Sequence, residues 1–271
     1  MRNDIVKNIS NGLLSLYIFY ANLLLGWQLV SFIYLYQTTN LTQILNRQLQ
    51  WLNIQPYLIG VGAAITIILL IVHRLSPLSH LQHISGLPKQ VLIQNIFLML
   101  LFFNYLSTVL HIHLELFELV AFLFSLWVLK RWGSVFFHSK LIEWRHPTTH
   151  GSFYVSGFLT GTALLSLFHP EGIDSLVLYI VLVILLVFDL FIVFARFQYL
   201  SRSGELTKRI ARNLMGRNIL FFGLRVIMGI FMPLVFILYM ILFKRDGIQG
   251  VEILILTGSF LDKYLYFKNQ T

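Results

Sequence analysis

The sequence predicts an all-α integral membrane protein, with residues 1–271 forming a single bundle of eight transmembrane helices. The first observation behind this prediction is composition: 57% of the residues are hydrophobic and 11% are charged, whereas soluble domains are about 45–50% apolar and about 25% charged. The second is length, because eight apolar stretches approach the roughly 20 residues that a helix needs to cross a bilayer. The sequence also contains no cysteine. This excludes disulfides, thiolate zinc sites and cysteine-ligated iron–sulfur clusters in this chain.

The predicted spans, in chain order, cover residues 11–36, 54–75, 90–111, 114–137, 151–168, 175–199, 215–243 and 251–267. The first is a retained helix, because its apolar run exceeds the roughly 7–15 residues of a signal-peptide core and no cleavage site follows. A very short link around His111–His113 joins the third and fourth. The fifth is short and carries Gly157 and Gly161, a spacing that lets helix backbones approach closely unless it arises by chance. Asp189 interrupts the sixth, and Arg225 interrupts the seventh.

Basic residues indicate the orientation of the bundle. With eight spans, both termini lie on one face, which receives sixteen of the twenty Lys and Arg residues, against three on the opposite face. The positive-inside rule then places both termini in the cytoplasm and the chain in the inner (plasma) membrane. The net charge of +9 is explained by this bias and by affinity for anionic lipid headgroups, so nucleic-acid binding is not expected. The basic segment Ser201–Arg217 is interpreted as an ordinary cytoplasmic loop.

Polar side chains inside predicted spans are candidates for function, because they are costly in lipid. Asp189 and Arg225 lie at similar depth from the loop that joins their spans, so an Asp189–Arg225 ion pair is expected. The pair either neutralises itself and pins two helices together or lines a proton or substrate path. Asn22 and Gln28 interrupt the first span; such amides either bond across helices or contact a ligand.

The nine histidines fall near the ends of the predicted spans, and none is centred in one. Two stacked haems would need facing histidine pairs well inside the bundle, so a dihaem cytochrome is disfavoured, while a single haem near one face stays open. A zinc site from His80 and His83 is a further alternative, although no carboxylate is near them. No haem or metal is therefore expected in this chain. Motifs of nucleotide-binding, serine-hydrolase and zinc-protease sites are absent from the sequence.

Several segments together resemble the membrane anchor subunit of dimethyl sulfoxide reductase and related molybdoenzymes. The first span, L-Y-I-F-Y-A-N-L-L-L-G-W, has an amide followed four residues later by glycine, as in that family. S-P-L-S-H-L-Q resembles its histidine–leucine motif, and W-R-H-P-T-T-H-G-S-F-Y-V-S-G its entry into the fifth helix. F-F-G-L-R-V-I-M-G carries an arginine in a similar place, and T-G-S-F-L-D-K-Y-L-Y-F resembles its closing segment. The similarity is diffuse and covers most of the chain.

The resemblance implies an anchor that oxidises a quinol, typically menaquinol, and holds an iron–sulfur electron-transfer subunit and a molybdopterin catalytic subunit at the lipid bilayer. It places the quinol at His80, with Gln90, Asn22 and Arg225 as further contacts. The nearby His83 is a further candidate from its chemistry, as a group that assists or replaces His80 in taking the quinol proton. The sequence departs from the family at Gln90, where an acidic residue is expected. It departs again at residue 259, which is serine in place of the family's glutamate.

The chemistry is coherent with this expectation. A quinol hydroxyl needs a proton acceptor tuned near neutral pH, which an imidazole such as His80 provides. The electrons must leave to a cluster that a cysteine-free chain does not ligate itself. The alternative function is a secondary transporter or channel in which Asp189 and Arg225 line a path, although transporters often show inverted repeats that are not evident here. A third alternative is an interaction or assembly protein without a ligand.

Overall fold

The secondary structure is helical throughout the part of the chain that the computed structural model describes, which is residues 2–35, 54–69, 71, 86–110, 115–139, 144–168, 175–202, 204–243 and 250–268. Six helical segments there are long and apolar enough to cross a membrane. They lie in α1 (Arg2–Leu35), α3 (Leu87–Val109), α4 (Glu115–Phe137), α5 (Thr148–Phe168), α6 (Ser175–Arg202) and the continuous stretch Ile219–Phe243. The prediction of an all-helical, multi-pass membrane protein is therefore confirmed in its general form.

The count of eight spans is not confirmed, because two predicted spans differ from the six in length or charge. The second is described as a shorter apolar helix, Ile54–Leu69. The eighth corresponds to α10 (Val251–Lys268), whose sequence includes two acidic and two basic residues. The link predicted around His111–His113 lies outside the described residues.

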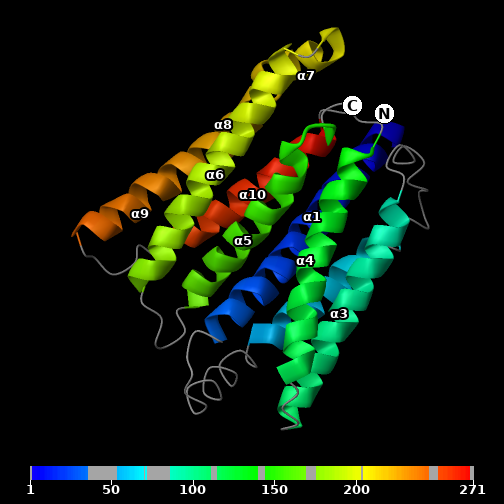
Figure 1. Ribbon diagram of the computed structural model, residues 1–271. Helices are drawn as coiled ribbons and strands as arrows, with labels where there is room; N and C mark the ends of the chain where they lie inside the picture. Colours follow the sequence, from blue (N-terminus) through cyan, green and yellow to red (C-terminus); the bar gives the residue numbers. More distant parts are fainter. Residues whose placement is uncertain are drawn as a thin grey trace.

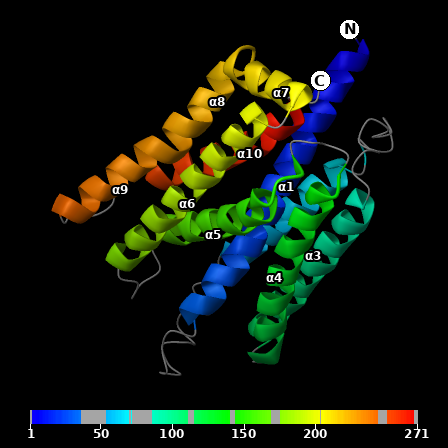
Figure 2. The ribbon, with the colours of Figure 1, turned by 45° about the horizontal axis from the view of Figure 1, so that its top comes forward.

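The helices pack around α1 and α5, which run side by side through the middle of the molecule (Figures 1 and 2). Helices α3 and α4 lie on one side of this pair, and α6 and α8–α9 lie on the other. Helix α10 packs against α1 and α5 on its inner side. The first turn of α1 and the last turn of α10 lie at the same end of the bundle (Figure 1). The side of the membrane that this end faces stays a prediction.

Apolar side chains divide between a core and an outer surface. Along α1, Leu14, Leu25 and Leu29 are completely buried. On α6, by contrast, Phe191 and Phe194 are about two-thirds exposed, at 66% and 65%. Large apolar side chains that point outward along a long helix are expected where the surrounding solvent is lipid.

Glycines bring α1 and α5 into backbone contact. A Cβ atom on Gly26 would overlap the carbonyl group of Gly157, and one on Gly161 would overlap the backbone of Gly26. The Gly157–Gly161 spacing therefore serves close packing, as the sequence indicates, because small residues let two helix axes approach.

The stretch Ile219–Phe243 is one continuous helix with a wider turn in its middle. It consists of α8 (Ile219–Val226), a π-helical segment η3 (Ile227–Phe231) and α9 (Met232–Phe243). The backbone N–H of Met232 donates to the carbonyl of Ile227, five residues earlier. Pro233 follows directly and has no N–H to donate, so the regular hydrogen-bond ladder is interrupted here.

The interpretation of Ser201–Arg217 as an ordinary loop is wrong, because the segment contains the helix α7 (Glu205–Met215). Its apolar residues Ala211 and Leu214 are buried three apart, whereas Lys208 and Arg212 are exposed. Helix α7 begins after Gly204, whose φ of 143° is a value that favours glycine. In Figure 1 it extends beyond the ends of α6 and α8.

Candidate functional site

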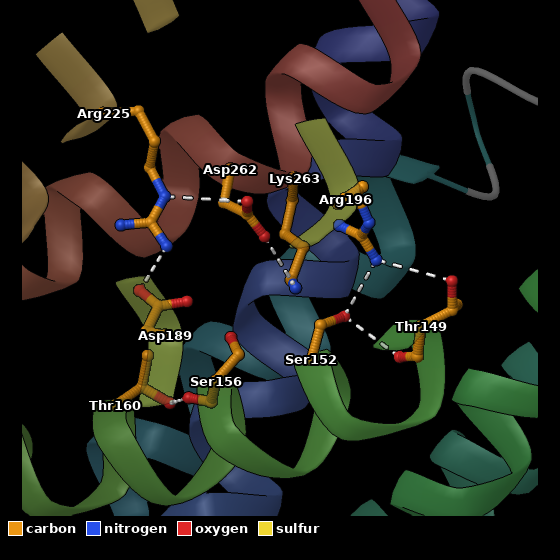
Figure 3. A network of polar contacts seen from close by, with 9 residues as sticks. All are labelled: Thr149, Ser152, Ser156, Thr160, Asp189, Arg196, Arg225, Asp262 and Lys263. Carbon is orange, nitrogen blue, oxygen red and sulfur yellow. Dashed lines mark hydrogen bonds and ion pairs between the residues drawn. The ribbon is translucent and has the colours of Figure 1, made fainter. Parts of the chain in front are cut away.

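A network of charged side chains lies inside the bundle between α6, α8 and α10 (Figure 3). Its members are three basic residues, Arg196, Arg225 and Lys263, and two acidic residues, Asp189 and Asp262. Arg225 is 3% exposed and Lys263 is completely buried. Charges at this depth are costly unless they are paired, so the way in which these five groups meet defines the site.

Arg225 is the centre of the ion pairing. Its Nη2 donates to Asp189, so the structure brings together the two residues that the sequence pairs by depth. Its Nε also lies 3.6 Å from Oδ1 of Asp262. The other carboxylate oxygen of Asp262 accepts a hydrogen bond of 3.1 Å from Nζ of Lys263. One guanidinium and one ammonium group thus share two carboxylates contributed by different helices.

A glycine contact explains why Arg225 meets Asp262. Helices α8–η3 and α10 run in opposite directions and touch at Gly229 and Gly258, where a Cβ atom on Gly229 would lie 2.6 Å from the Cα of Gly258. Arg225 stands four residues before Gly229, and Asp262 stands four residues after Gly258. In antiparallel helices these positions lie at the same level, one turn from the crossing point. The close approach therefore sets the Arg225–Asp262 separation.

Helix α5 presents a polar stripe to the network. Thr149, Ser152, Ser156 and Thr160 recur every three or four residues, which places them on one face of the helix. Nη2 of Arg196 donates to the hydroxyls of Thr149 and Ser152, both at 3.4 Å. The hydroxyl of Thr160 donates to the backbone carbonyl of Ser156 at 2.8 Å.

Aromatic rings form the remaining wall around two of the cations. The guanidinium carbon of Arg196 lies 5.7 Å from the ring centre of Trp144, and Nζ of Lys263 lies 4.8 Å from that of Phe153. Both rings belong to a buried stacked cluster with Phe136. Such cation–π contacts contribute about 0.5–2 kcal/mol each and help to hold positive charge in the interior.

His146 lies just before α5, at the edge of the network. Its Nδ1 is 2.6 Å from the hydroxyl of Thr148, and its ring packs against Tyr199 at 4.7 Å between centres. Burial lowers the pKa of His146, and the positive charge of Arg196 lowers it further.

The residues predicted to bind quinol are not gathered into one site by the structure. His80 and His83 lie outside the described residues. Gln90, on α3, donates to the carbonyl of Val128 on α4 at 3.3 Å. Asn22, on α1, has its backbone oxygen near Gly157 of α5, and Arg225 belongs to the charged network. In the described ranges, no three His, Asp or Glu side chains gather as a metal site requires.

The amides among these residues retain unused hydrogen-bonding capacity. Asn22 is completely buried, and neither its side-chain oxygen nor its nitrogen has a hydrogen-bond partner in the described structure. The side-chain oxygen of Gln90 is also buried and unpartnered there, although its nitrogen is bonded. Gln28, the other amide in the first span, is buried as well. Most buried polar groups in proteins are satisfied, so the exceptions mark candidate contacts for a ligand.

Arg196, Lys263 and Asp262 belong to the network although sequence reasoning did not place them there. Arg196 and Lys263 are among the sixteen basic residues that the sequence assigns to the face holding the termini, yet both are buried in the bundle. The sequence does hold a signal for Arg196, because it follows Asp189 by seven residues and so lies on the same side of α6. The polar stripe of α5 is a second sign in the sequence that polar groups meet inside the bundle.

Comparison of this chain with family models, with curated proteins and with solved structures finds no match. The expected relationship to the dimethyl sulfoxide reductase anchors therefore stays a prediction from the sequence.

Proposed function

We propose that this chain is the quinol-oxidising membrane anchor subunit of an oxidoreductase that contains molybdopterin and iron–sulfur subunits. Its substrate is menaquinol or another quinol, and it passes electrons to the iron–sulfur partner. The observation that carries the proposal is the side chain of Asn22, which is completely buried and without a hydrogen-bond partner in the described structure.

An unsatisfied buried amide fits a quinol in its hydrogen-bonding capacity. The amide oxygen accepts from a quinol hydroxyl, and the amide nitrogen donates to a hydroxyl or quinone oxygen. Leaving such a group unpaired costs about 1–3 kcal/mol, which binding of a polar ring substituent recovers. The free oxygen of Gln90 offers a second acceptor, although the two amides lie against different neighbours.

The reaction releases two electrons and two protons from each quinol. An amide such as that of Asn22 orients a quinol hydroxyl group but does not take its proton, so a titratable group must do so. In the family that the sequence resembles, this group maps to His80. The electrons leave to a partner's cluster, because a chain without cysteine lacks the usual cluster ligands.

The test combines affinity capture with a binding titration. The tagged protein is purified in mild detergent and its partners are identified by mass spectrometry. A fluorescent quinol analogue is then titrated into the wild type, Asn22→Ala, His80→Ala and the control Asn104→Ala, which removes a buried amide on α3. Co-purified iron–sulfur and molybdopterin subunits, with binding weakened at least tenfold in the first two variants and unchanged in the control, support the proposal. A lone protein with no affinity for the analogue refutes it.

A secondary transporter or channel is the second candidate, and the charged network favours it. Asp189, Arg225, Asp262 and Lys263 form a buried chain of linked groups across three helices, and Arg196 bonds to the α5 hydroxyls nearby. Ionisable residues within membranes commonly mark proton or ion paths. The purified protein in liposomes would then conduct protons or a small ion. Flux that Asp189→Asn abolishes supports this candidate, and vesicles as tight as empty ones refute it.

A further inference from the structure

An open groove lies between the last turns of α6 and helix α7. Its volume is about 450 Å³. Helix α6 lines it with Phe197 and Ser201, and α7 lines it with Lys208, Arg212 and Met215 among others. None of the lining residues belongs to the charged network of Figure 3. Apolar and cationic side chains therefore meet in one cavity at the end of the bundle, apart from the buried charges.

The α6 side of the groove continues the surface that this helix presents to lipid. Phe194, Phe197 and Ser201 recur at three- and four-residue spacing, so they share one face of the helix. Phe194 is 65% exposed, as expected of a ring in contact with lipid chains. With its 28 residues, α6 is about 42 Å long, whereas the hydrocarbon core of a bilayer is about 30 Å thick. Its last turn, which carries the exposed Ser201 and Arg202, thus lies at the level of the lipid headgroups.

The α7 side of the groove is cationic. Lys208, Arg212 and Met215 follow at four- and three-residue spacing and share one face, and the two cationic side chains are 48% and 72% exposed. Glu205, on the same face, lies 3.7 Å from Nζ of Lys208 and 3.6 Å from Nη2 of Arg212. Both distances exceed hydrogen-bond length, so the pairing leaves the N–H donors of both cations available. Two cations and one carboxylate give the described lining of the groove one positive charge.

We infer that this groove binds an anionic phospholipid that carries one phosphodiester charge, such as phosphatidylglycerol. The phosphate accepts hydrogen bonds from Lys208 and Arg212 and neutralises the remaining positive charge. One acyl chain lies along Met215 and Phe197 towards Phe194, where apolar surface is exposed. Free phosphate has the same charged group but leaves the apolar wall uncovered. The site is separate from the residues proposed to bind quinol.

Native mass spectrometry of the purified full chain, delipidated in a neutral detergent, measures lipid binding. Dioleoyl phosphatidylglycerol and dioleoyl phosphatidylcholine are titrated separately, and the abundance of each one-lipid complex gives its Kd. Phosphatidylglycerol should bind about tenfold more tightly, because phosphatidylcholine has the same chains but no net charge. Inorganic phosphate at the concentration of the lipid should not displace it, because phosphate makes no contact with the apolar wall.

A matched pair of double variants tests the cations. Lys208→Gln with Arg212→Gln removes both groove cations and should abolish the preference for phosphatidylglycerol. Arg209→Gln with Arg217→Gln removes the same charge from exposed positions outside the lining of the groove and should retain the preference.

A second pair tests the space in the groove without a change of charge. Ser201→Trp places a bulky ring in the groove and should weaken the binding of phosphatidylglycerol as much as the loss of the two cations does. Gln198→Trp makes a comparable change at an exposed position of the same helix end, outside the lining of the groove, and should leave binding intact. Size-exclusion chromatography confirms that each compared variant is folded.

Any of four results overturns the inference. Equal affinity of the wild type for the two lipids shows that the groove does not recognise the phosphodiester charge. An equal loss of preference in the two charge-removing variants assigns binding to the overall charge of the segment. Displacement by inorganic phosphate, or binding that Ser201→Trp leaves unchanged, shows that no lipid occupies the groove.

Discussion

Replacing Asn22 by alanine should leave the folded protein about as stable as the wild type, while it weakens quinol binding. The reason is that the amide of Asn22 is completely buried and takes part in no hydrogen bond in the described structure. If the amide instead made the interhelical hydrogen bond that buried amides usually make, its removal would destabilise the protein and leave quinol binding unchanged. The substitution therefore separates a role in binding from a role in packing.

Three contributions set the magnitude of the change. Removing the unsatisfied amide recovers about 1–3 kcal/mol of desolvation free energy. Alanine is also the better helix former, by up to about 0.7 kcal/mol. Against these, the truncation loses packing worth about 1 kcal/mol for each group of methylene size. The truncation removes three heavy atoms, so these terms nearly cancel, and the free energy of unfolding should change by no more than about 2 kcal/mol in either direction.

Thermal unfolding in detergent, followed without added quinone, measures this change. Asn104→Ala is the comparison, because Asn104 is a buried amide that does take part in a polar interaction and its loss should destabilise the protein by about 1–2 kcal/mol. Destabilisation of Asn22→Ala by more than about 2 kcal/mol would refute the reasoning. It would show that the amide stabilises the helix packing.

Three further predictions concern packing, ion pairing and pH. Gly26→Ala should destabilise the protein by about 3 kcal/mol or more, because the new methyl group overlaps the carbonyl of α5; thermal unfolding measures it. Arg225→Gln should cost about 3–5 kcal/mol, because it leaves Asp189 buried without its cation. The double variant with Asp189→Asn should recover part of this loss in the same assay. The lowered pKa of His146 means that the unfolded chain takes up its proton first as the pH falls. Stability should therefore decrease as the pH falls from the unfolded pKa of about 6.5 towards the lower folded value.

Each of these predictions has its own control. Gly12→Ala, on the same helix with open space around its Cβ position, should gain about 0.5–1 kcal/mol, and an equal loss at both glycines would contradict the packing argument. Equal stability of the single and double ion-pair variants would show that the pair is not coupled. In a His146→Gln variant, the free energy of unfolding should depend less on pH in this range. An unchanged dependence would show that another group causes it.

The membrane character and most helices could be predicted because long apolar runs are a direct consequence of the lipid environment. The sequence did not predict helix α7, because its three exposed basic residues lower the mean hydropathy of the segment and hide its short apolar face. The seventh predicted span begins at Ile219, after α7, and not at residue 215.

The candidate site was predictable in part. Asp189 and Arg225 could be paired from the sequence because each is a single charged residue in an apolar helix. The two helices are consecutive, the charges are opposite and lie at equal depth, and each has few other ways to be neutralised. Lys263 could not be placed from the sequence, because a lysine near a helix end usually extends to the interface. What holds it inside is the aromatic ring of Phe153 and the ion pair with Asp262, whose carboxylate also faces Arg225; these contacts depend on tertiary packing.

The charge of α10 has a consequence for the synthesis and assembly of the protein. A charged side chain at the centre of an isolated inserted helix costs about 2.5–3.5 kcal/mol on translocon scales, so this helix, with its buried Asp262 and Lys263, gains little by entering lipid alone. It is made after α5, α6 and α8, which hold its ionic and aromatic partners. Its insertion is therefore a late step that depends on the earlier helices being in place. A chain truncated before α10 would expose Arg225 and Asp189 to lipid and become a substrate for quality-control proteolysis.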